Sequence, residues 1–190
     1  LHFFPIRRSS DLKTTKGLSA AVYYNKSATY SSVCKGVSHD AVNIEPDMLF
    51  SIGSNSKILA SVCLLKLHEQ GKVNIDDSLG KYLPALSPNI SGKITIRQLL
   101  RHQSGLYDYI NDDALDSMGA DYNRFWTPTE LINKFVKAPV AAPGAPWQYC
   151  NTNYLLAGML VEKIHGKSYM ESVKELILTP AGIDSLYLMG

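Results

Sequence analysis

Two short stretches of the chain carry side chains that could do chemistry together. Ser54 and Lys57 lie three positions apart, and Tyr149 and Asn151 follow much later in the chain. Residues three apart on a helix share a face, so the Lys57 amine can reach the Ser54 hydroxyl. A serine hydroxyl is a poor nucleophile until a neighbouring base takes its proton. The pattern therefore indicates a serine nucleophile activated by an amine and a phenol, which is chemistry suited to a carbonyl carbon and an acyl intermediate.

The role of Lys57 has more than one interpretation. A free lysine has a pKa of about 10.4 and is protonated at neutral pH. It can act as a base only if burial or a second cation lowers that pKa. Otherwise it stays charged and stabilises Tyr149 as the phenolate. The residues alone leave both roles open, beside the simplest alternative, in which Ser54 caps a helix and Lys57 is solvated.

The surroundings of Ser54 favour a functional role for the Ser-x-x-Lys pattern. From residue 58 to residue 67 only Ser61 and Lys66 are polar, which predicts a helix that is apolar nearly all round and hence buried. Gly71 is a typical stop for it. Ser54 then lies at the first turn, where unpaired N–H groups stabilise negative charge. The copies of the pattern at Ser10–Lys13 and Ser32–Lys35 lack this setting.

The remaining elements explain how distant residues could meet. Residues 18–24 and 28–37 are rich in β-formers and flank a turn at 25–27, which predicts a hairpin. A loop at 138–147 carries three prolines and gives Tyr149 a stiff approach. Capping patterns and stop residues predict helices that open at Thr95, Thr127, Ser168 and either Asn151 or Thr152, the last ending near His165 and the one after Ser168 ending before Pro180.

Several segments in this order resemble one protein superfamily. They are residues 17–22 (GLSAAV), 49–57 (LFSIGSNSK), 94–106 (ITIRQLLRHQSGL), 143–144 (PG) and 147–154 (WQYCNTNY). Together they resemble the N-terminal part of the serine β-lactamase and penicillin-binding-protein superfamily. The branch they most resemble contains class C β-lactamases, D-alanyl-D-alanine carboxypeptidases and related esterases.

The resemblance implies a role for each residue of the pattern. Ser54 is implied as the acylated nucleophile, Lys57 as its partner and Tyr149 as the general acid and base. Asn151 is implied to bind the substrate amide and Lys57. A Ser-Asp-Asn element holds the equivalent place in other branches of the superfamily. Cys150 departs from the small or hydroxylated residue common between the tyrosine and the asparagine.

The implied fold is α+β, with an antiparallel sheet flanked by helices and a mainly helical lobe. The implied function is serine hydrolysis of an amide, ester or β-lactam carbonyl through an acyl-enzyme, without metal or organic cofactor. Its partner would be a small-molecule or peptide substrate, and its location the bacterial periplasm or cell envelope, although no signal peptide is visible. The alternative is a non-catalytic penicillin- or peptidoglycan-binding or sensor relative, or an inactive fragment.

Both ends of the chain depart from the family pattern. The superfamily's Lys/His-Ser/Thr-Gly element, which lies on a late strand, does not occur in these 190 residues. We therefore expect residues 13–190 to be an incomplete domain, truncated before the later sheet strands. Residues 1–12 are expected to be a non-native tail, because residues 8–12 (RSSDL) match a translated sequencing-adapter end.

Composition narrows the class of protein further. A net charge of +2 and 45% hydrophobic residues indicate a soluble globular protein, with no feature that favours nucleic acid or an anionic membrane as partner. No stretch reaches the roughly 18 apolar residues of a membrane span. An odd number of cysteines and scattered histidines favour neither a disulfide framework nor a metal site. These residues are Cys34, Cys63 and Cys150, with His2, His39, His68, His102 and His165.

Overall fold

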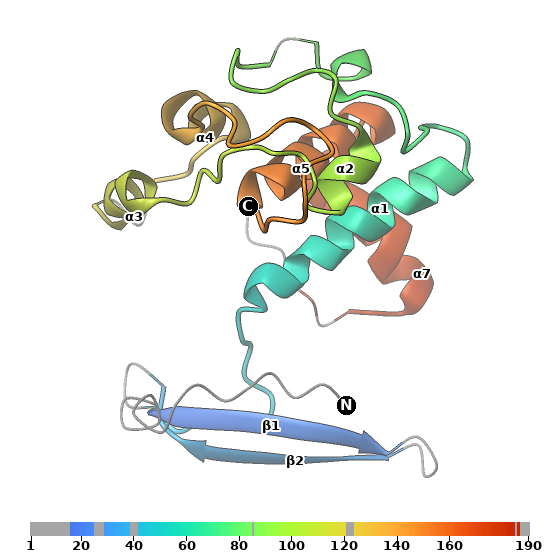
Figure 1. The fold of residues 1–190 in the computed structure, drawn as a ribbon. Coiled ribbons are helices and arrows are strands. Elements are labelled where there is room, and N and C mark those ends of the chain that lie inside the picture. Colours follow the sequence, from blue (N-terminus) through green and yellow to red (C-terminus); the bar gives the residue numbers. More distant parts are fainter. Residues whose placement is uncertain are drawn as a thin grey trace. The chain divides into compact units, whose positions relative to one another are not determined.

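The computed structural model describes residues 16–24, 29–38, 42–84, 86–120, 124–184 and 186. The chain divides into two compact units, Leu1–Ile52 and Gly53–Gly190. Among the described residues, the first unit contains the strands and the second contains the helices (Figure 1). The small antiparallel sheet and the helical unit together give the α+β class expected from the sequence.

The sheet consists of β1 (Gly17–Tyr24) and β2 (Thr29–Gly36). The strands pair antiparallel, with Gly17 opposite Gly36 and Tyr24 opposite Thr29, which confirms the predicted hairpin strands. The predicted turn at residues 25–27 and the expected boundary at residue 12 lie outside the described residues. Residues three apart on a strand point to opposite faces, so the Ser32–Lys35 copy of the pattern cannot form a reactive pair.

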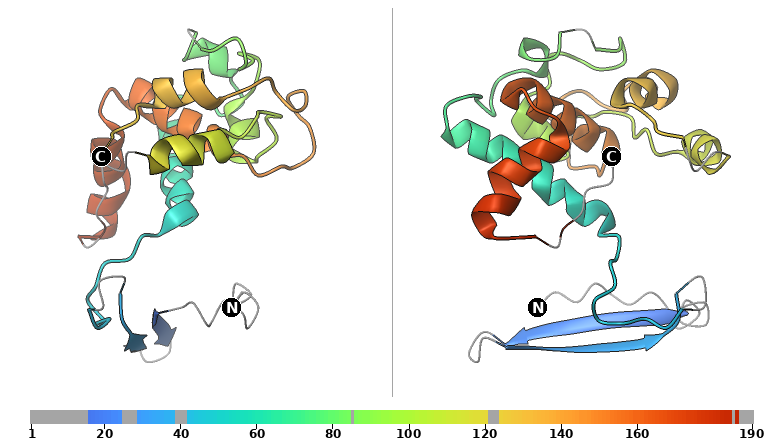
Figure 2. Two further views of the ribbon diagram at one scale, coloured as in Figure 1. Left: turned by 90° about the vertical axis from the view of Figure 1, so that its left-hand side faces the viewer. Right: turned by 180° about the vertical axis from the view of Figure 1, so that it is seen from behind.

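The helical unit is built around one central pair of helices. Its elements are η2 (Gly53–Ser56), α1 (Lys57–Glu69), η3 (Leu79–Lys81), α2 (Ile96–Leu100), α3 (Asp112–Gly119), α4 (Pro128–Phe135), α5 (Asn151–His165), α6 (Tyr169–Val173), the π-helical turn η4 (Lys174–Leu178) and α7 (Thr179–Ala181). Helix α1 packs on α5 (Figures 1 and 2). Elements α6 and η4 also contact α1, and helices α2 and α4 also contact α5.

The core lies on one side of α1. Ala60, Cys63, Leu64 and Leu67 are buried at helical spacing and join the buried apolar side chains of α5. The prediction that this helix is buried nearly all round is wrong, because Ile58 is 63% exposed and Leu65 is 43% exposed. The helices that pack on α1 cover one side of it, which leaves part of the apolar surface uncovered.

The predicted helix starts are confirmed by their capping geometry. Three helices open with a capping box, in which the cap hydroxyl accepts a backbone N–H and the third helical side chain accepts the N–H of the cap. These pairs are Thr95 with Gln98, Thr127 with Glu130, and Ser168 with Glu171. Helix α5 begins at Asn151 and ends at His165 before the left-handed Gly166, also as predicted.

The last helical segment differs from its prediction. The helix after Ser168 was expected to end before Pro180, but the chain stays helical to Ala181 and ends at the left-handed Gly182. The π-helical turn η4 precedes the proline. A π turn widens the hydrogen-bond ladder, which accommodates a residue that has no N–H to give.

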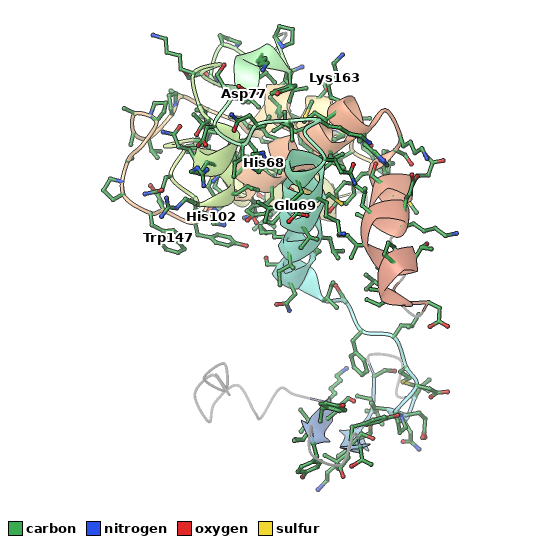
Figure 3. All side chains as sticks on the ribbon, turned by 90° about the vertical axis from the view of Figure 1, so that its right-hand side faces the viewer. His68, Glu69, Asp77, His102, Trp147 and Lys163 are labelled. Atoms are coloured by element: carbon green, nitrogen blue, oxygen red, sulfur yellow. The ribbon has the colours of Figure 1, made fainter. Side chains whose placement is uncertain are left out.

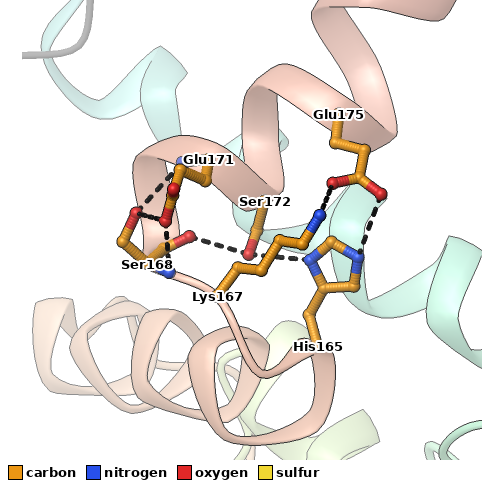
Figure 4. Close-up of polar contacts among 6 residues, drawn as sticks. All are labelled: His165, Lys167, Ser168, Glu171, Ser172 and Glu175. Atoms are coloured by element: carbon orange, nitrogen blue, oxygen red, sulfur yellow. Dashed lines mark hydrogen bonds and ion pairs between the residues drawn. The ribbon is translucent and has the colours of Figure 1, made fainter.

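A polar cluster fastens this segment to the end of α5 (Figure 4). His165 Nδ1 lies 3.0 Å from Ser172 Oγ, and Glu175 pairs with Lys167 and lies 3.9 Å from His165 Nε2. A serine, a histidine and a glutamate in line invite comparison with a hydrolytic triad. However, Ser172 is fully buried and its hydroxyl donates to the Ser168 carbonyl at 2.8 Å. The cluster therefore has a structural role, in which it joins the end of α5 to the segment after Ser168.

Two loops of the helical unit lie side by side and carry the approach to Tyr149. The carbonyl of Gly105 accepts the N–H groups of Val140 and Ala141, and the carbonyl of Gln103 accepts that of Gly144. Gly105 has φ +72°, and a Cβ there would lie 2.2 Å from the Ala141 carbonyl oxygen. Only glycine permits both this conformation and this close approach.

We expect Gly105→Ala to lower the free energy of unfolding by more than about 2 kcal/mol, because left-handed strain adds to an overpacked contact. Gly71→Ala is the matched control, since Gly71 has φ +70° but nothing within 4 Å of its added Cβ. Strain alone predicts a loss of about 1 kcal/mol there. Urea unfolding measures both losses, and equal losses would contradict the proposed close packing of the loops.

Candidate active site

The structure brings all four predicted site residues together within the helical unit. Lys57 Nζ lies 3.1 Å from Ser54 Oγ and 2.8 Å from Asn151 Oδ1, and it donates to both oxygens. The Tyr149 hydroxyl donates to Ser54 Oγ at 2.8 Å. Ser54 is exposed and Lys57 is half-buried, so the hydroxyl is open to an incoming molecule while the amine is held by protein groups.

Local backbone geometry explains why Ser54 faces Lys57. Ser54 lies in η2, and Lys57 is the first residue of α1. The Ser56 hydroxyl donates to the Gly53 carbonyl at 2.7 Å and closes this turn. The serine therefore stands one helical turn before the lysine, as the spacing predicted.

Local geometry also explains the pairing of Tyr149 with Asn151. Cys150 is the N-cap of α5 and has extended backbone angles, φ −152° and ψ 119°. In extended backbone, alternate side chains point to one side, so Tyr149 and Asn151 face the site together. Cys150 points the other way and is 3% exposed, and this burial raises the pKa of its thiol. The unusual cysteine is thus a core residue and not a second nucleophile.

The charge of Lys57 acts on the Tyr149 phenol. Burial by itself would raise the pKa of Tyr149, but hydrogen bonding to Lys57 and Ser54, together with the nearby positive charge, outweighs it and lowers the pKa below its usual value near 10. Lys57 Nζ also lies 5.0 Å from the centroid of the Tyr149 ring. The phenolate is therefore easier to form here than in water.

Sequence reasoning missed one acidic residue of the site. Asp108 Oδ2 accepts Asn151 Nδ2 at 2.9 Å. This contact fixes the orientation of the Asn151 amide and turns its oxygen toward Lys57. The loop that carries Asp108 is tied to α5 by Thr152, whose hydroxyl accepts the N–H of Tyr109 and donates to the Tyr107 carbonyl. The only sequence signal was an acid shortly after the matched segment 94–106.

A cavity of about 330 Å³ opens beside Lys57 and Asn151. Its walls include apolar side chains of α1 and α5 and the ring of Tyr109, among them Leu59, Ala60, Leu155 and Met159. In the part of the chain that the structure describes, no group of three or more histidine, cysteine or acidic residues is placed to hold a metal ion. Nor is any described helix long and apolar enough to cross a membrane.

A four-residue site of this geometry, in a chain that combines a helical unit with a small antiparallel sheet, is typical of serine-centred acyl-transfer proteins. Comparison with known families agrees with that class. The model of the beta-lactamase family matches residues 7–188. The chain therefore belongs to the beta-lactamase family.

Individual relatives and solved structures extend this result. Protein flp of Staphylococcus aureus strain MW2 is 30% identical over 166 residues, which cover 84% of this chain and 31% of the relative. A D-stereospecific amidohydrolase from Streptomyces sp. has a TM-score of 0.74 at 31% identity, over 86% of this chain and 48% of that one. A D-amino acid amidase from Ochrobactrum anthropi SV3, complexed with D-phenylalanine, has a TM-score of 0.76 at 26% identity, over 92% and 48%.

The chain thus spans about a third of the length of the curated relatives it matches. It spans about half of each of the two solved structures. The family match over residues 7–188 includes both the strands and the helical unit of this chain.

We expect Lys57→Gln to raise the pKa of Tyr149, because removing the cation takes away the main stabilisation of the phenolate. The chain has 11 tyrosines, so the measurement is a phenolate titration by absorbance with Tyr149→Phe subtracted. Lys66→Gln, which removes an amine elsewhere on α1, is the control and should leave the pKa of Tyr149 unchanged. A Tyr149 pKa that does not move in Lys57→Gln would contradict the coupling.

We expect Asp108→Ala to slow acylation of Ser54 about 10- to 100-fold, because the freed Asn151 amide no longer presents its oxygen to Lys57. Asp116→Ala, at an exposed acid on α3, is the matched control. The rate is measured by intact-mass spectrometry with an acylating β-lactam. Equal rates in the two variants would show that Asp108 has no positioning role.

Proposed function

We propose that the chain carries the acylation site of a serine hydrolase that opens an amide, ester or β-lactam carbonyl through an acyl-enzyme on Ser54. One observation carries the proposal: Ser54 Oγ lies within hydrogen-bond distance of both Lys57 Nζ and the Tyr149 hydroxyl. A nucleophile and a base at this separation are the minimum that covalent catalysis requires. Membership of the beta-lactamase family supports the same class of reaction.

Tyr149 is the base in this proposal. As an ammonium group, Lys57 has only protons to give, and it gives them to Ser54 and Asn151. When Tyr149 is ionised, its oxygen, which lies 2.8 Å from Ser54 Oγ, becomes the neighbouring acceptor for the Ser54 proton. The lowered pKa of Tyr149 increases the fraction of the residue present as phenolate, which is the form that can accept a proton. The alternative role, in which neutral Lys57 is the base, predicts that Tyr149→Phe still acylates.

The reaction follows from these positions. Ser54 Oγ attacks the carbonyl carbon while its proton passes to the Tyr149 oxygen. The bond to the leaving nitrogen or oxygen then breaks, and Tyr149 returns the proton to that atom. In the deacylation step, a water molecule gives a proton to Tyr149, and the water oxygen adds to the acyl carbon. The Ser54 ester bond breaks, the proton returns to Ser54 Oγ, and a carboxylic acid leaves.

The proposed substrate class is a carbonyl compound with an apolar substituent next to the reacting carbon. The cavity beside Lys57 and Asn151 has apolar walls and the volume for such a group. One similar solved structure is named a D-stereospecific amidohydrolase and the other a D-amino acid amidase, which supports D-amino acid amides as the first substrates to test.

We expect a fluorophosphonate or a penicillin to add one adduct to the wild-type chain and none to Ser54→Ala. Ser32→Ala is the matched control, because Ser32 is the exposed serine of another Ser-x-x-Lys copy and lies on β2. Intact-mass spectrometry followed by peptide mapping locates the adduct. An adduct that persists in Ser54→Ala would contradict the nucleophile assignment.

The same experiment separates the two classes of function. An adduct that decays with release of product supports hydrolysis. A stable adduct, with no product from the amide, ester or β-lactam, supports the penicillin-binding or sensor alternative.

A further inference from the structure

His102 occupies an unusual position between the two loops of the site. It follows α2 and has φ +54°, which is the left-handed region that few non-glycine residues adopt. Its backbone carbonyl accepts the N–H of Gln148, one residue before Tyr149. Figure 3 shows His102 beside Trp147, with 6.0 Å between the ring centroids. The residue therefore faces the chain segment that leads into Tyr149.

Hydrogen bonds fix the tautomer of the His102 ring. The Cys150 N–H lies 3.1 Å from His102 Nδ1, and Asn153 Nδ2 lies 3.3 Å from the same atom. The Ser104 hydroxyl donates to Asn153 Oδ1 at 2.5 Å, so the amide of the fully buried Asn153 presents its N–H group to the ring. Two N–H donors point at one nitrogen. Nδ1 must therefore accept, and the ring proton lies on Nε2.

The imidazole also supports the Tyr149 ring directly. The two ring centroids are 4.7 Å apart and the planes are inclined by 27°, which is a stacked arrangement. The Tyr154 ring lies at 5.2 Å from His102. Tyr149 precedes α5 and is 40% exposed, so its side chain needs support from outside that helix. The stack and the Cys150 contact supply that support.

We infer that His102 is a positioning residue, whose neutral imidazole stacks on Tyr149 and accepts the Cys150 N–H, and so holds the phenol against Ser54 Oγ. The inference rests on the proposed function, in which Tyr149 transfers the proton of Ser54. His102 does not touch the reacting atoms. It acts on the reaction through the position of Tyr149.

The charges around His102 keep it neutral. Burial and the positive charge of Lys57 lower the pKa of His102, and the negative charge of Asp108 acts in the opposite direction. Tyr149 and Tyr154 are titratable residues whose rings lie against the His102 ring. Protonation at Nδ1 would remove the acceptor for two N–H groups. A lowered folded-state pKa means that this stabilisation is complete above about pH 6.5 and is lost as the pH falls through the folded-state value.

The test compares three variants. His102→Gly tolerates the left-handed backbone but removes the ring, and His102→Gln keeps a side-chain acceptor that does not titrate. His68→Gln is the matched control, because His68 Nδ1 also contacts a backbone group, the Val73 carbonyl at 2.9 Å, away from the site. Acylation of Ser54 by a penicillin is followed by intact-mass spectrometry across pH 5 to 8.

We expect His102→Gly to acylate about tenfold or more slowly at saturating penicillin, with little change in the concentration for half-maximal rate, and His102→Gln to recover part of the loss. Protonation of His102 should decrease the rate of Ser54 acylation toward acid pH. This decrease should be absent from His102→Gln and present in His68→Gln. Wild-type rates and pH profiles in both His102 variants would overturn the inference.

A second measurement keeps this result separate from the proposed function. In ¹⁵N-labelled wild type, the Cys150 amide should show scalar coupling across its hydrogen bond to His102 Nδ1, and the Tyr149 ring signals should shift in His102→Gln but not in His68→Gln. If the wild type is not acylated, the proposed function fails while this spectrum still decides the positioning. An absent coupling with unmoved Tyr149 signals overturns it.

Discussion

The candidate site depends on the contacts that the ammonium group of Lys57 makes. Lys57 is the first residue of α1, where the helix dipole disfavours a positive charge. The Asn151 amide oxygen at 2.8 Å, the Ser54 hydroxyl at 3.1 Å and the ring of Tyr149 compensate it. Because these groups come from the starts of α1 and α5, one cation joins the two halves of the site, and it also lowers the pKa of the phenol.

The packing of α1 on α5 holds the residues at the starts of the two helices together. Both helices place buried apolar side chains in one core, which includes Leu64, Leu67, Leu156 and Leu160. A close-packed interior is hardly compressible, so the distance between the starts of the two helices stays fixed. The loops around Gly105 and Val140 then hold the segment that enters α5. The site is therefore built from two helix starts and two mutually bonded loops.

Prediction from the sequence was strongest where the signal was local. The capping boxes at Thr95, Thr127 and Ser168 formed as expected, since each needs only residues within one helical turn. Prediction was weaker where distant packing decides the outcome. Ile58 belongs to an apolar run, yet only the fold shows which side of α1 the other helices cover. Pro180 suggested a helix end, but the π-helical turn before it let the helix continue.

By itself, the sequence determined the types of the reactive groups and their local spacing. The placement of Ser54 one turn before Lys57 follows from helix geometry, and the shared direction of Tyr149 and Asn151 follows from one extended residue between them. Only the tertiary structure decided that the two pairs meet, and that Asp108 and His102 orient them. Such contacts join residues more than forty positions apart, so no local pattern encodes them. They depend on how the whole helical unit packs.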